Sequence, residues 1–541
     1  MDFLVQAQNA HIQLTTDMVL LRFVDKVDFS YRTLFDVSYY DEQGLEHVLG
    51  PVKIGMRSMR SKGSILEYIP TRFRALDDSF FSLGQDEAYY SNLKELGTEK
   101  RVAILKALRD IAYDRKHFDH CKNLAVMQRS ILRNISAFSA SGRLRRMASG
   151  DLRLARYSFS FVLPDVQGMP TTKLDFEVIP ESNPATNVHV LIGRNGTGKT
   201  RLLQSMIRSL TTGDTSGGRF SYKHDRTNAD TDKFANILCV AFSPFDDFSS
   251  LGTKDPRIPW SFIGLNMQRS EEDEQQSEED EQRPERNDLC LELKAAIEQK
   301  FCNALLSCME VAWKQKLWTE SINILKSDRT FQDEEIERFA VYASDQELDL
   351  PGKEQLIKTE FSKLSSGHKV VLLIITGCVD KIEEKSIVFM DEPENHLHPP
   401  LLSALIRSLS ELLKKRNGVA IISTHSPVVL QEVPRKCVWV LNKYGDYRKA
   451  EHPTIRTFGA SIGSLTNDVF GLEVSNSGFH KLLCDAVAQL EKENRENPYP
   501  SRESAAQWKK RSYERITTLF DRQLGDEADL LLWTMLSLQE E

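Results

Sequence analysis

The fold of this 541-residue chain is decided by one stretch in its first half, Gly193-Arg194-Asn195-Gly196-Thr197-Gly198-Lys199-Thr200. The stretch matches the pattern G-x-x-x-x-G-K-[ST] and lies between an apolar run, residues 188–192, and a helix-like run that carries Leu202. A strand, a glycine-rich loop and a helix in this order are typical of a phosphate-binding loop, whose backbone N–H groups surround the phosphates of a nucleotide. We expect Lys199 to neutralise the β and γ oxygens and Thr200 to give its hydroxyl to Mg²⁺.

A second stretch, Leu364-Ser365-Ser366-Gly367-His368-Lys369, precedes an apolar run and predicts a helix from Gly367 to Cys378. The first turn of a helix offers unpaired N–H groups and a positive dipole end to an anion. Two phosphate sites on one chain are consistent with a nucleotide that is held between two copies of the protein.

An apolar strand, residues 386–390, ends in two carboxylates, Asp391 and Glu392. After a phosphate loop, this pattern predicts that Asp391 holds the Mg²⁺ hydration shell and that Glu392 polarises the attacking water as a base. The alternative is a solvated acidic turn.

His425 ends the next apolar strand along the chain, in Ser423-Thr424-His425-Ser426-Pro427. An isolated histidine at such a position is more often a cap or a core residue. Its place at the exit of a strand next to the Asp-Glu strand favours a catalytic role.

Short apolar strands that alternate with helices predict an α/β fold with a parallel sheet covered on both faces. The expected core strands are 188–192, 237–241, 387–390, 419–422 and 438–441. Before them, alternating residues from Met18 to Tyr40 and from Tyr157 to Ile179 predict an antiparallel sheet. A helix is expected from Thr98, as its N-cap, to Ala112.

We expect four regions along the chain. Residues 1–250 would hold the N-terminal β region and the phosphate loop, 251–375 an inserted helical lobe, and 376–452 the rest of the core. Residues 453–541 read as a helical tail that could contact a partner. Within the lobe, 267–288 is acidic and Gln-rich, which predicts a disordered loop, and a helix follows with one apolar face from Leu293 to Ala312.

Charge does not decide for or against nucleic acid as a partner. The net charge is −8, and the two runs 271–274 and 278–281 alone contain eight acidic residues. Two basic groups could hold nucleic acid phosphates or could be ordinary surface charge. They are Arg143, Arg145, Arg146, Arg153 and Arg156, and Lys53, Arg57, Arg60 and Lys62.

The eight cysteines form no C-x-x-C pair, which is typical of buried thiols in a reducing compartment. The longest apolar stretch is about half the length that a membrane helix needs. We therefore expect a cytoplasmic protein.

The phosphate loop, the Leu-Ser-Ser-Gly signature, the Asp-Glu strand and the strand ending in histidine occur in an order that resembles the ABC-type ATPases of the SMC, RecF and OLD group. The resemblance covers about residues 188–445. It implies ATP and Mg²⁺ as cofactors, with Ser365, Ser366 and Gly367 contacting the γ-phosphate across a subunit interface. It also implies that 394–398 is the D-loop that crosses the interface and that His425 is the switch histidine.

The chain departs from that pattern in two places. Ser366 and His368 replace the usual Gly and Gln, and the run 242–246 (Phe-Ser-Pro-Phe-Asp) stands where a Q-loop glutamine is expected. These departures suggest slow or conditional hydrolysis.

A narrower resemblance is carried by the runs 391–399 (DEPENHLHP), 241–246 (AFSPFD) and 457–463 (TFGASIG). They are similar to PtuA, the family of ATPase subunits of Septu and retron-associated antiphage defence systems. This resemblance implies a homodimer or higher oligomer and a partner HNH nuclease. In the retron form it also implies a reverse transcriptase with its multicopy single-stranded DNA.

Two other functions compete with this interpretation. One is a RecF-like or SMC-like clamp in DNA repair, although the insertion lacks the long heptad run of a coiled-coil arm. The other is the ATPase subunit of a membrane transporter, which the missing Q-loop glutamine and the long N-terminal part disfavour.

Overall fold

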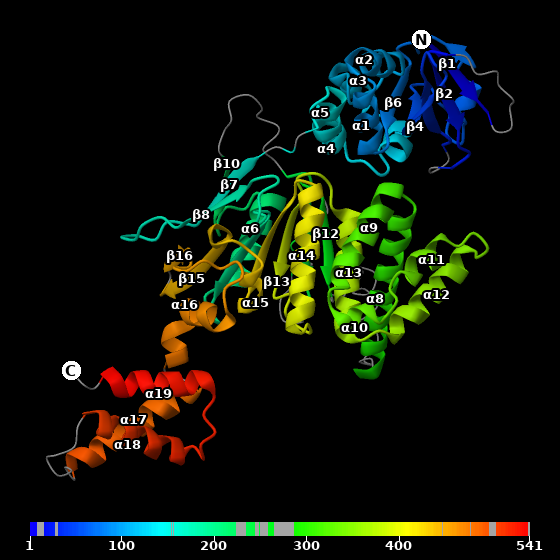
Figure 1. Cartoon of the computed structure of the whole chain (residues 1–541). Helices are drawn as coiled ribbons and strands as arrows, with labels where there is room; N and C mark the ends of the chain where they lie inside the picture. The colour runs from blue at the N-terminus through cyan, green and yellow to red at the C-terminus, as the bar shows by residue number, and fades with distance from the viewer. Residues whose placement is uncertain are drawn as a thin grey trace, which may run out of the picture.

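The computed structural model of the chain describes residues 1–7, 16–27, 31–152, 154, 156–222, 234–243, 248, 251, 258–264, 286–445, 447–475, 478–496 and 505–538. They form an N-terminal domain, a central α/β region and a C-terminal group of helices (Figure 1). Two predictions concern residues outside these ranges. They are the acidic segment before Arg286 and residues 244–246 of the Q-loop position.

A seven-stranded sheet forms the centre of the molecule, in the order β12-β11-β13-β14-β9-β15-β16. Its strands are β9 (Val188–Gly193), β11 (Ile237–Ala241), β12 (Trp260–Gly264), β13 (Ile387–Asp391), β14 (Val419–Thr424), β15 (Val438–Tyr444) and β16 (Tyr447–Glu451). All pairs are parallel except β15 with β16. The five predicted core strands are confirmed, whereas β12 and β16 were missed. The carboxyl ends of β9, β13 and β14 therefore meet at one edge of the sheet.

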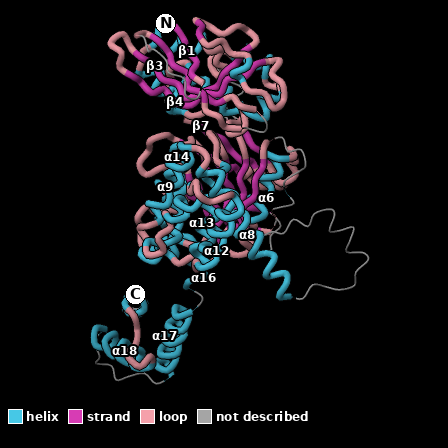
Figure 2. The backbone as a smooth tube through the Cα atoms, turned by 90° about the vertical axis from the view of Figure 1, so that its right-hand side faces the viewer, coloured by secondary structure: helices cyan, strands magenta, loops and turns pink. Residues whose placement is uncertain are grey.

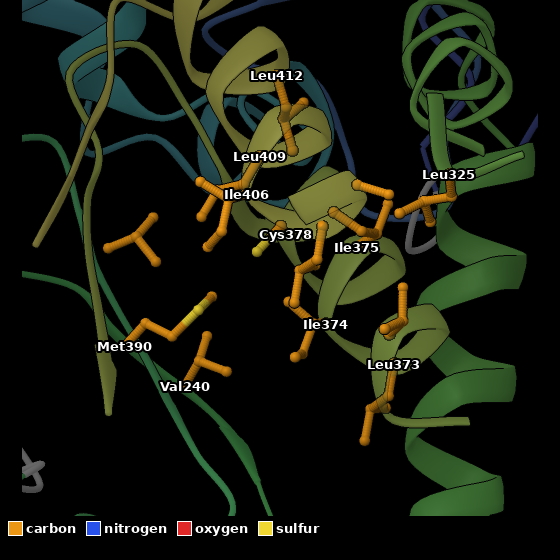
Figure 3. Packing of buried hydrophobic residues seen from close by; sticks show 14 of the residues in the cluster. Val240, Leu325, Leu373, Ile374, Ile375, Cys378, Met390, Ile406, Leu409 and Leu412 are labelled. Atoms are coloured by element: carbon orange, nitrogen blue, oxygen red, sulfur yellow. The ribbon is translucent and has the colours of Figure 1, made fainter. Parts of the chain in front are cut away.

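Helices cover both faces of this sheet. Successive side chains of a strand point to opposite faces, so Leu191 packs toward α6 (Lys199–Thr211) while its neighbour Ile192 packs toward the helical side. That second face is covered by α13 (Ser366–Lys381) and α14 (Pro399–Lys415). Figure 3 shows Val240 and Met390 of the sheet facing Ile374 of α13.

The helical lobe consists of α8 (Arg286–Met309), α9 (Ala312–Leu325), α10 (Arg329–Gln332), α11 (Arg338–Ser344), α12 (Leu350–Lys363) and α13. The prediction of one helical face from Leu293 to Ala312 was wrong at its end. Helix α8 ends at Met309 and Ala312 begins α9, because Val311 between them takes an extended backbone conformation, φ −125° and ψ 116°.

The N-terminal domain has its own sheet, in the order β5-β1-β2-β3-β4-β6, and its own buried core. The strands are β1 (Asp2–Gln6), β2 (Met18–Phe23), β3 (Leu34–Tyr40), β4 (Glu46–Met56), β5 (Arg72–Phe73) and β6 (Phe80–Gly84). The helices are α1 (Glu87–Glu95), α2 (Thr98–Ala107), α3 (Arg115–Cys121), α4 (Ala137–Ser139) and α5 (Arg145–Ala148). Antiparallel pairing of β2 with β3 is confirmed, but β1 runs parallel to β2. The helix predicted to reach Ala112, with Thr98 as its N-cap, is α2. Its N-cap is Gly97, its first residue is Thr98, and it ends at Ala107.

The strands predicted between Tyr157 and Ile179 do not join the N-terminal sheet. They are β7 (Tyr157–Val162) and β8 (Lys173–Val178), which form a separate antiparallel sheet with β10 (Arg219–Tyr222). Their apolar side chains, including Phe159 and Phe176, pack with Leu203 of α6 in one core cluster. Burial of these rings against the central region explains why the strands belong to it.

The C-terminal helices are α16 (Ile462–Ser475), α17 (Gly478–Glu496), α18 (Ala505–Leu519) and α19 (Asp526–Leu538). The last three share a small core of their own around Leu483, Ile516 and Leu532. Figure 2 shows α17 and α18 beyond α16, at the opposite end of the molecule from the N-terminal domain.

Candidate nucleotide site

The phosphate loop connects β9 to α6 at the carboxyl edge of the central sheet. Its last glycine, Gly198, is the N-cap of α6 and takes a left-handed conformation, φ 84° and ψ 32°, that other residues rarely adopt. The loop can therefore turn sharply and direct the first N–H groups of α6 toward an anion.

Lys199 is almost fully buried in this loop. Its Nζ donates hydrogen bonds to the carbonyl oxygens of Gly193 (3.0 Å) and Arg194 (3.2 Å). Burial lowers the pKa of Lys199, and the carboxylates of Glu392, Asp391 and Glu394 act in the opposite direction. The carboxylates thus help to keep an ammonium group charged beside the loop.

Thr200 and Asp391 come together although they are far apart in the sequence. The Thr200 hydroxyl donates to Asp391 Oδ2 at 2.9 Å. Asp391 is the last residue of β13, two strands from β9, and is 4% exposed. A hydroxyl and a carboxylate at this distance provide the hard oxygen ligands that suit Mg²⁺, so the residues present fit the expected metal.

Glu392 and His425 also meet at the sheet edge. The His425 Nε2 lies 3.1 Å from Glu392 Oε1, and its Nδ1 lies 3.4 Å from Lys199 Nζ. Glu392 has a positive φ of 46°, a strained conformation that often marks functional sites. One chain thus brings the phosphate-loop lysine, the expected base and the expected switch histidine into a single cluster.

The surroundings of His425 favour its neutral form. Burial lowers the pKa of His425, the Lys199 ammonium lowers it further, and the carboxylates of Glu392 and Glu394 oppose the shift. A neutral imidazole matches its two neighbours, because Nε2–H can donate to Glu392 while Nδ1 accepts from Lys199.

Glu394 holds His425 in place, a role that sequence reasoning missed. Its Oε1 accepts hydrogen bonds from the backbone N–H of His425 (2.7 Å) and from the Thr424 hydroxyl (2.8 Å). The resemblance implied only that Glu394 begins the D-loop. Nothing in the local sequence indicates this contact, because it joins two loops that follow neighbouring strands.

The signature residues lie at the start of α13. Ser365 is the N-cap and its Oγ accepts from the His368 N–H at 3.3 Å. Ser365 and Ser366 are exposed, so a second molecule can reach them. A Cβ on Gly367 would lie 3.0 Å from the carbonyl oxygen of His396, which places the expected D-loop directly against the signature of the same chain.

His368 and His398 belong to one hydrogen-bonded network around the short helix α10. His368 Nδ1 lies 3.2 Å from Glu334 Oε1, and its Nε2 lies 3.4 Å from the Thr330 hydroxyl. The Thr330 hydroxyl donates to Oδ1 of Asp328. The other carboxylate oxygen of Asp328, Oδ2, lies 2.7 Å from His398 Nε2. The histidine that replaces the usual glutamine is therefore linked to the expected D-loop.

Several of the nine basic residues proposed for nucleic acid contact have partners within the chain. Arg143 bonds to Glu87, Arg146 to Glu384 and Arg156 to Glu177. Lys53 is buried and donates to the Ser130 carbonyl oxygen. Three others are exposed, namely Arg57, Arg60 and Lys62, and Arg153 lies outside the described residues.

These features define the class of the protein. A largely parallel sheet carries the phosphate loop, the Asp-Glu pair and the histidine at one edge, and a helical lobe begins its last helix with the signature. This is the fold of a P-loop ATPase of the ABC type. In agreement, residues 324–431 match the family model described as "AAA domain, putative AbiEii toxin, Type IV TA system", a range that contains the signature, the Asp-Glu pair and His425.

A relative that matches over nearly the whole of both sequences identifies the family of the chain. The chain is 35% identical over 533 residues to protein ea59 of Escherichia phage lambda, and the match covers 95% of this chain and 94% of the relative. The chain belongs to the family of protein ea59.

Among solved structures, the chain is similar to a nucleotide-free ATP-binding cassette from an ABC transporter. That match has 12% identity and a TM-score of 0.25, and it covers 52% of this chain and 85% of the other. The cbiO1 protein of Clostridium perfringens has 16% identity and a TM-score of 0.25, with coverage of 53% and 84%. Scores this low carry no weight beside the topology and the family match. Within the described residues, no helix is both long and apolar enough to cross a membrane.

Proposed function

We propose that the protein binds ATP and Mg²⁺ between the phosphate loop of one copy and the signature of another, and hydrolyses ATP slowly or conditionally. The cluster of Lys199, Glu392 and His425 beside the Thr200–Asp391 pair is the observation that carries this proposal.

Each residue has a distinct role in the proposed reaction. Thr200 and Asp391 would hold Mg²⁺, which supplies positive charge to the phosphate oxygens when bound. Glu392 orients the attacking water and accepts its proton. His425 keeps the Glu392 carboxylate in position, and Lys199 stabilises the charge that develops on the γ-phosphoryl group.

The Glu392→Gln variant tests this mechanism. It keeps the shape of the site but removes the base, so it should bind ATP and accumulate as a closed dimer that light scattering detects at twice the monomer mass. Lys199→Ala should show no ATP-induced change. If Glu392→Gln stays the same size with and without ATP, the proposed dimer is wrong.

For the biological role, we propose an antiphage defence ATPase of the Septu or retron type that controls a partner HNH nuclease. The PtuA-like runs and the match to the AbiEii-type ATPase domain support this role. An HNH protein encoded beside this gene should co-purify with the chain, and deleting either gene should abolish phage resistance. The proposal fails if neither result is obtained.

A RecF-like or SMC-like DNA clamp is the second candidate. The exposed residues Arg57, Arg60 and Lys62 favour it, since exposed cations near one another can contact DNA phosphates. ATP-dependent binding of DNA by the purified protein without a nuclease partner would support the clamp. A requirement for the HNH protein, or for a retron reverse transcriptase with its single-stranded DNA, would favour defence.

A further inference from the structure

We propose that Arg448 is a further nucleotide-binding residue, whose guanidinium binds the α- and β-phosphates beside the phosphate loop. The inference rests on the proposed binding of ATP, but none of the sequence motifs includes Arg448. This residue belongs to β16, the antiparallel edge strand of the central sheet.

The guanidinium of Arg448 lies directly over the last glycine of the phosphate loop. A Cβ on Gly198 would come within 3.0 Å of an Nη and 3.2 Å of the Nε of Arg448. A side chain at this position would make the guanidinium shift by a few tenths of an ångström, and the positive φ of 84° itself favours glycine. The guanidinium of Arg448 therefore packs closely against the phosphate loop.

The backbone of Arg448 is fixed by two neighbours. In the β15–β16 hairpin it pairs with Lys443, and its carbonyl oxygen accepts a hydrogen bond from the Thr172 hydroxyl at 2.5 Å. A strand held on both sides can direct a side chain more reproducibly than a free loop can.

The surroundings of Arg448 would be stabilised by a bound anion. Burial lowers the pKa of Arg448, and the nearby Arg201 lowers it further. Its Nε is buried and has no hydrogen-bond acceptor. Across the described ranges, no carboxylate forms an ion pair with Arg448. Two adjacent cations, one of them partly dehydrated, are unfavourable until a negative group joins them.

The position along the loop identifies which phosphates would fill this role. The backbone around Gly198 surrounds the α- and β-phosphates, whereas the side chain of Lys199 reaches the β and γ oxygens. The guanidinium of an arginine over Gly198 can donate hydrogen bonds to two phosphate oxygens at once. Arg448 should therefore contribute equally to the binding of ATP and ADP.

Isothermal titration of the full-length protein with Mg·ATP and with Mg·ADP tests the proposal. Arg448→Gln should weaken the binding of both nucleotides by about tenfold, the effect of one charge-assisted contact. Lys449→Gln is the matched control, because Lys449 is the next residue of the strand, is half exposed and pairs with Glu451. It should bind both nucleotides like the wild type.

Arg448→Lys keeps the charge but loses the two-pronged guanidinium, so it should bind both nucleotides with intermediate affinity. If Arg448→Gln melts at a lower temperature than the wild type, the affinity of Arg448→Lys tests the proposal instead. Unchanged affinity of a folded Arg448→Gln protein would overturn the role of this residue and leave the proposed function intact. A loss for ATP alone would overturn the assignment to the α- and β-phosphates. Wild-type protein that binds neither nucleotide would overturn the proposed function and this inference together.

Discussion

His425 is the residue whose charge most directly affects the proposed catalytic cluster. Because burial and Lys199 lower its pKa, the neutral form persists below the ordinary histidine value of about 6.5. We expect kcat/KM for ATP to fall on acidification with a midpoint below about pH 6.5, because kcat/KM reports the free protein. A midpoint above pH 6.5 would contradict the arrangement of these two residues.

Glu394 provides a second test at the residue scale. Replacement by Ala removes the acceptor of the His425 N–H and the Thr424 hydroxyl, so we expect a loss of about 1–3 kcal/mol in the free energy of unfolding. The kcat should fall while KM for ATP changes little, because His425 is displaced but the phosphate loop is not. Glu394→Gln retains an acceptor oxygen and should resemble the wild type in steady-state kinetics and urea unfolding.

At the scale of elements, α10 links the signature helix to the expected D-loop. Burial alone would raise the pKa of Asp328, but hydrogen bonds from the Thr330 hydroxyl, the Phe331 N–H and His398 lower it below its usual value. The carboxylate thus caps α10 and anchors His398 at the same time.

The prediction for Asp328 separates these two roles. Asp328→Ala loses both and should lower the free energy of unfolding by about 1–2 kcal/mol, the usual effect of an N-cap. Asp328→Asn keeps the cap and weakens only the contact with His398. If the linkage of signature and D-loop matters, urea unfolding of Asp328→Asn will be near normal while its ATP-induced dimerisation is weakened. Equal dimerisation of Asp328→Asn and wild type would show that α10 is only structural.

The elements that were predictable from the sequence share a simple property. Strands β11, β13, β14 and β15 begin with fully apolar runs, and β9 is apolar apart from the buried His189, because both faces of the sheet are covered. The edge strand β16, with Tyr447, Arg448 and Lys449, has no such run, and its place is set by pairing with β15. The motifs include Lys199, Thr200, Asp391, Glu392 and His425, whereas Glu394 reaches His425, and Arg448 reaches Gly198 of the phosphate loop, only through tertiary contacts.

At the scale of the molecule, the N-terminal domain contacts the central sheet at the edge opposite the nucleotide motifs. Arg146 forms an ion pair with Glu384, and the Ser139 hydroxyl donates to Glu383 at 3.1 Å. Arg416 bonds to Glu87 at 3.0 Å. Glu383 and Glu384 precede β13, and Arg416 precedes β14. The N-terminal domain therefore contacts the starts of the two strands whose ends carry Asp391 and lead into His425.

The ion pair between Arg146 and Glu384 predicts a measurable coupling between domain and core. The Glu384 side chain is 4% exposed, and burial raises its pKa although Arg146 and Arg143 lower it. Arg146→Met would leave a buried carboxylate without this partner and should destabilise the protein by about 1–3 kcal/mol. Adding Glu384→Gln should restore part of that loss in a double-mutant cycle followed by urea unfolding. Strictly additive effects would show that the pair contributes nothing to the interface.

The central claim is that each ATP is held by two copies of the chain, and mixing two inactive variants tests it most directly. Lys199→Ala inactivates the phosphate loop of one copy. Ser366→Arg blocks the signature of another copy at an exposed position outside the core. A mixed dimer would contain one intact site made of the remaining halves. We predict that each variant alone is inactive and that an equimolar mixture recovers about a quarter of the wild-type ATPase rate, because half of the randomly formed dimers carry one of two sites. A mixture as inactive as its components would contradict the shared site.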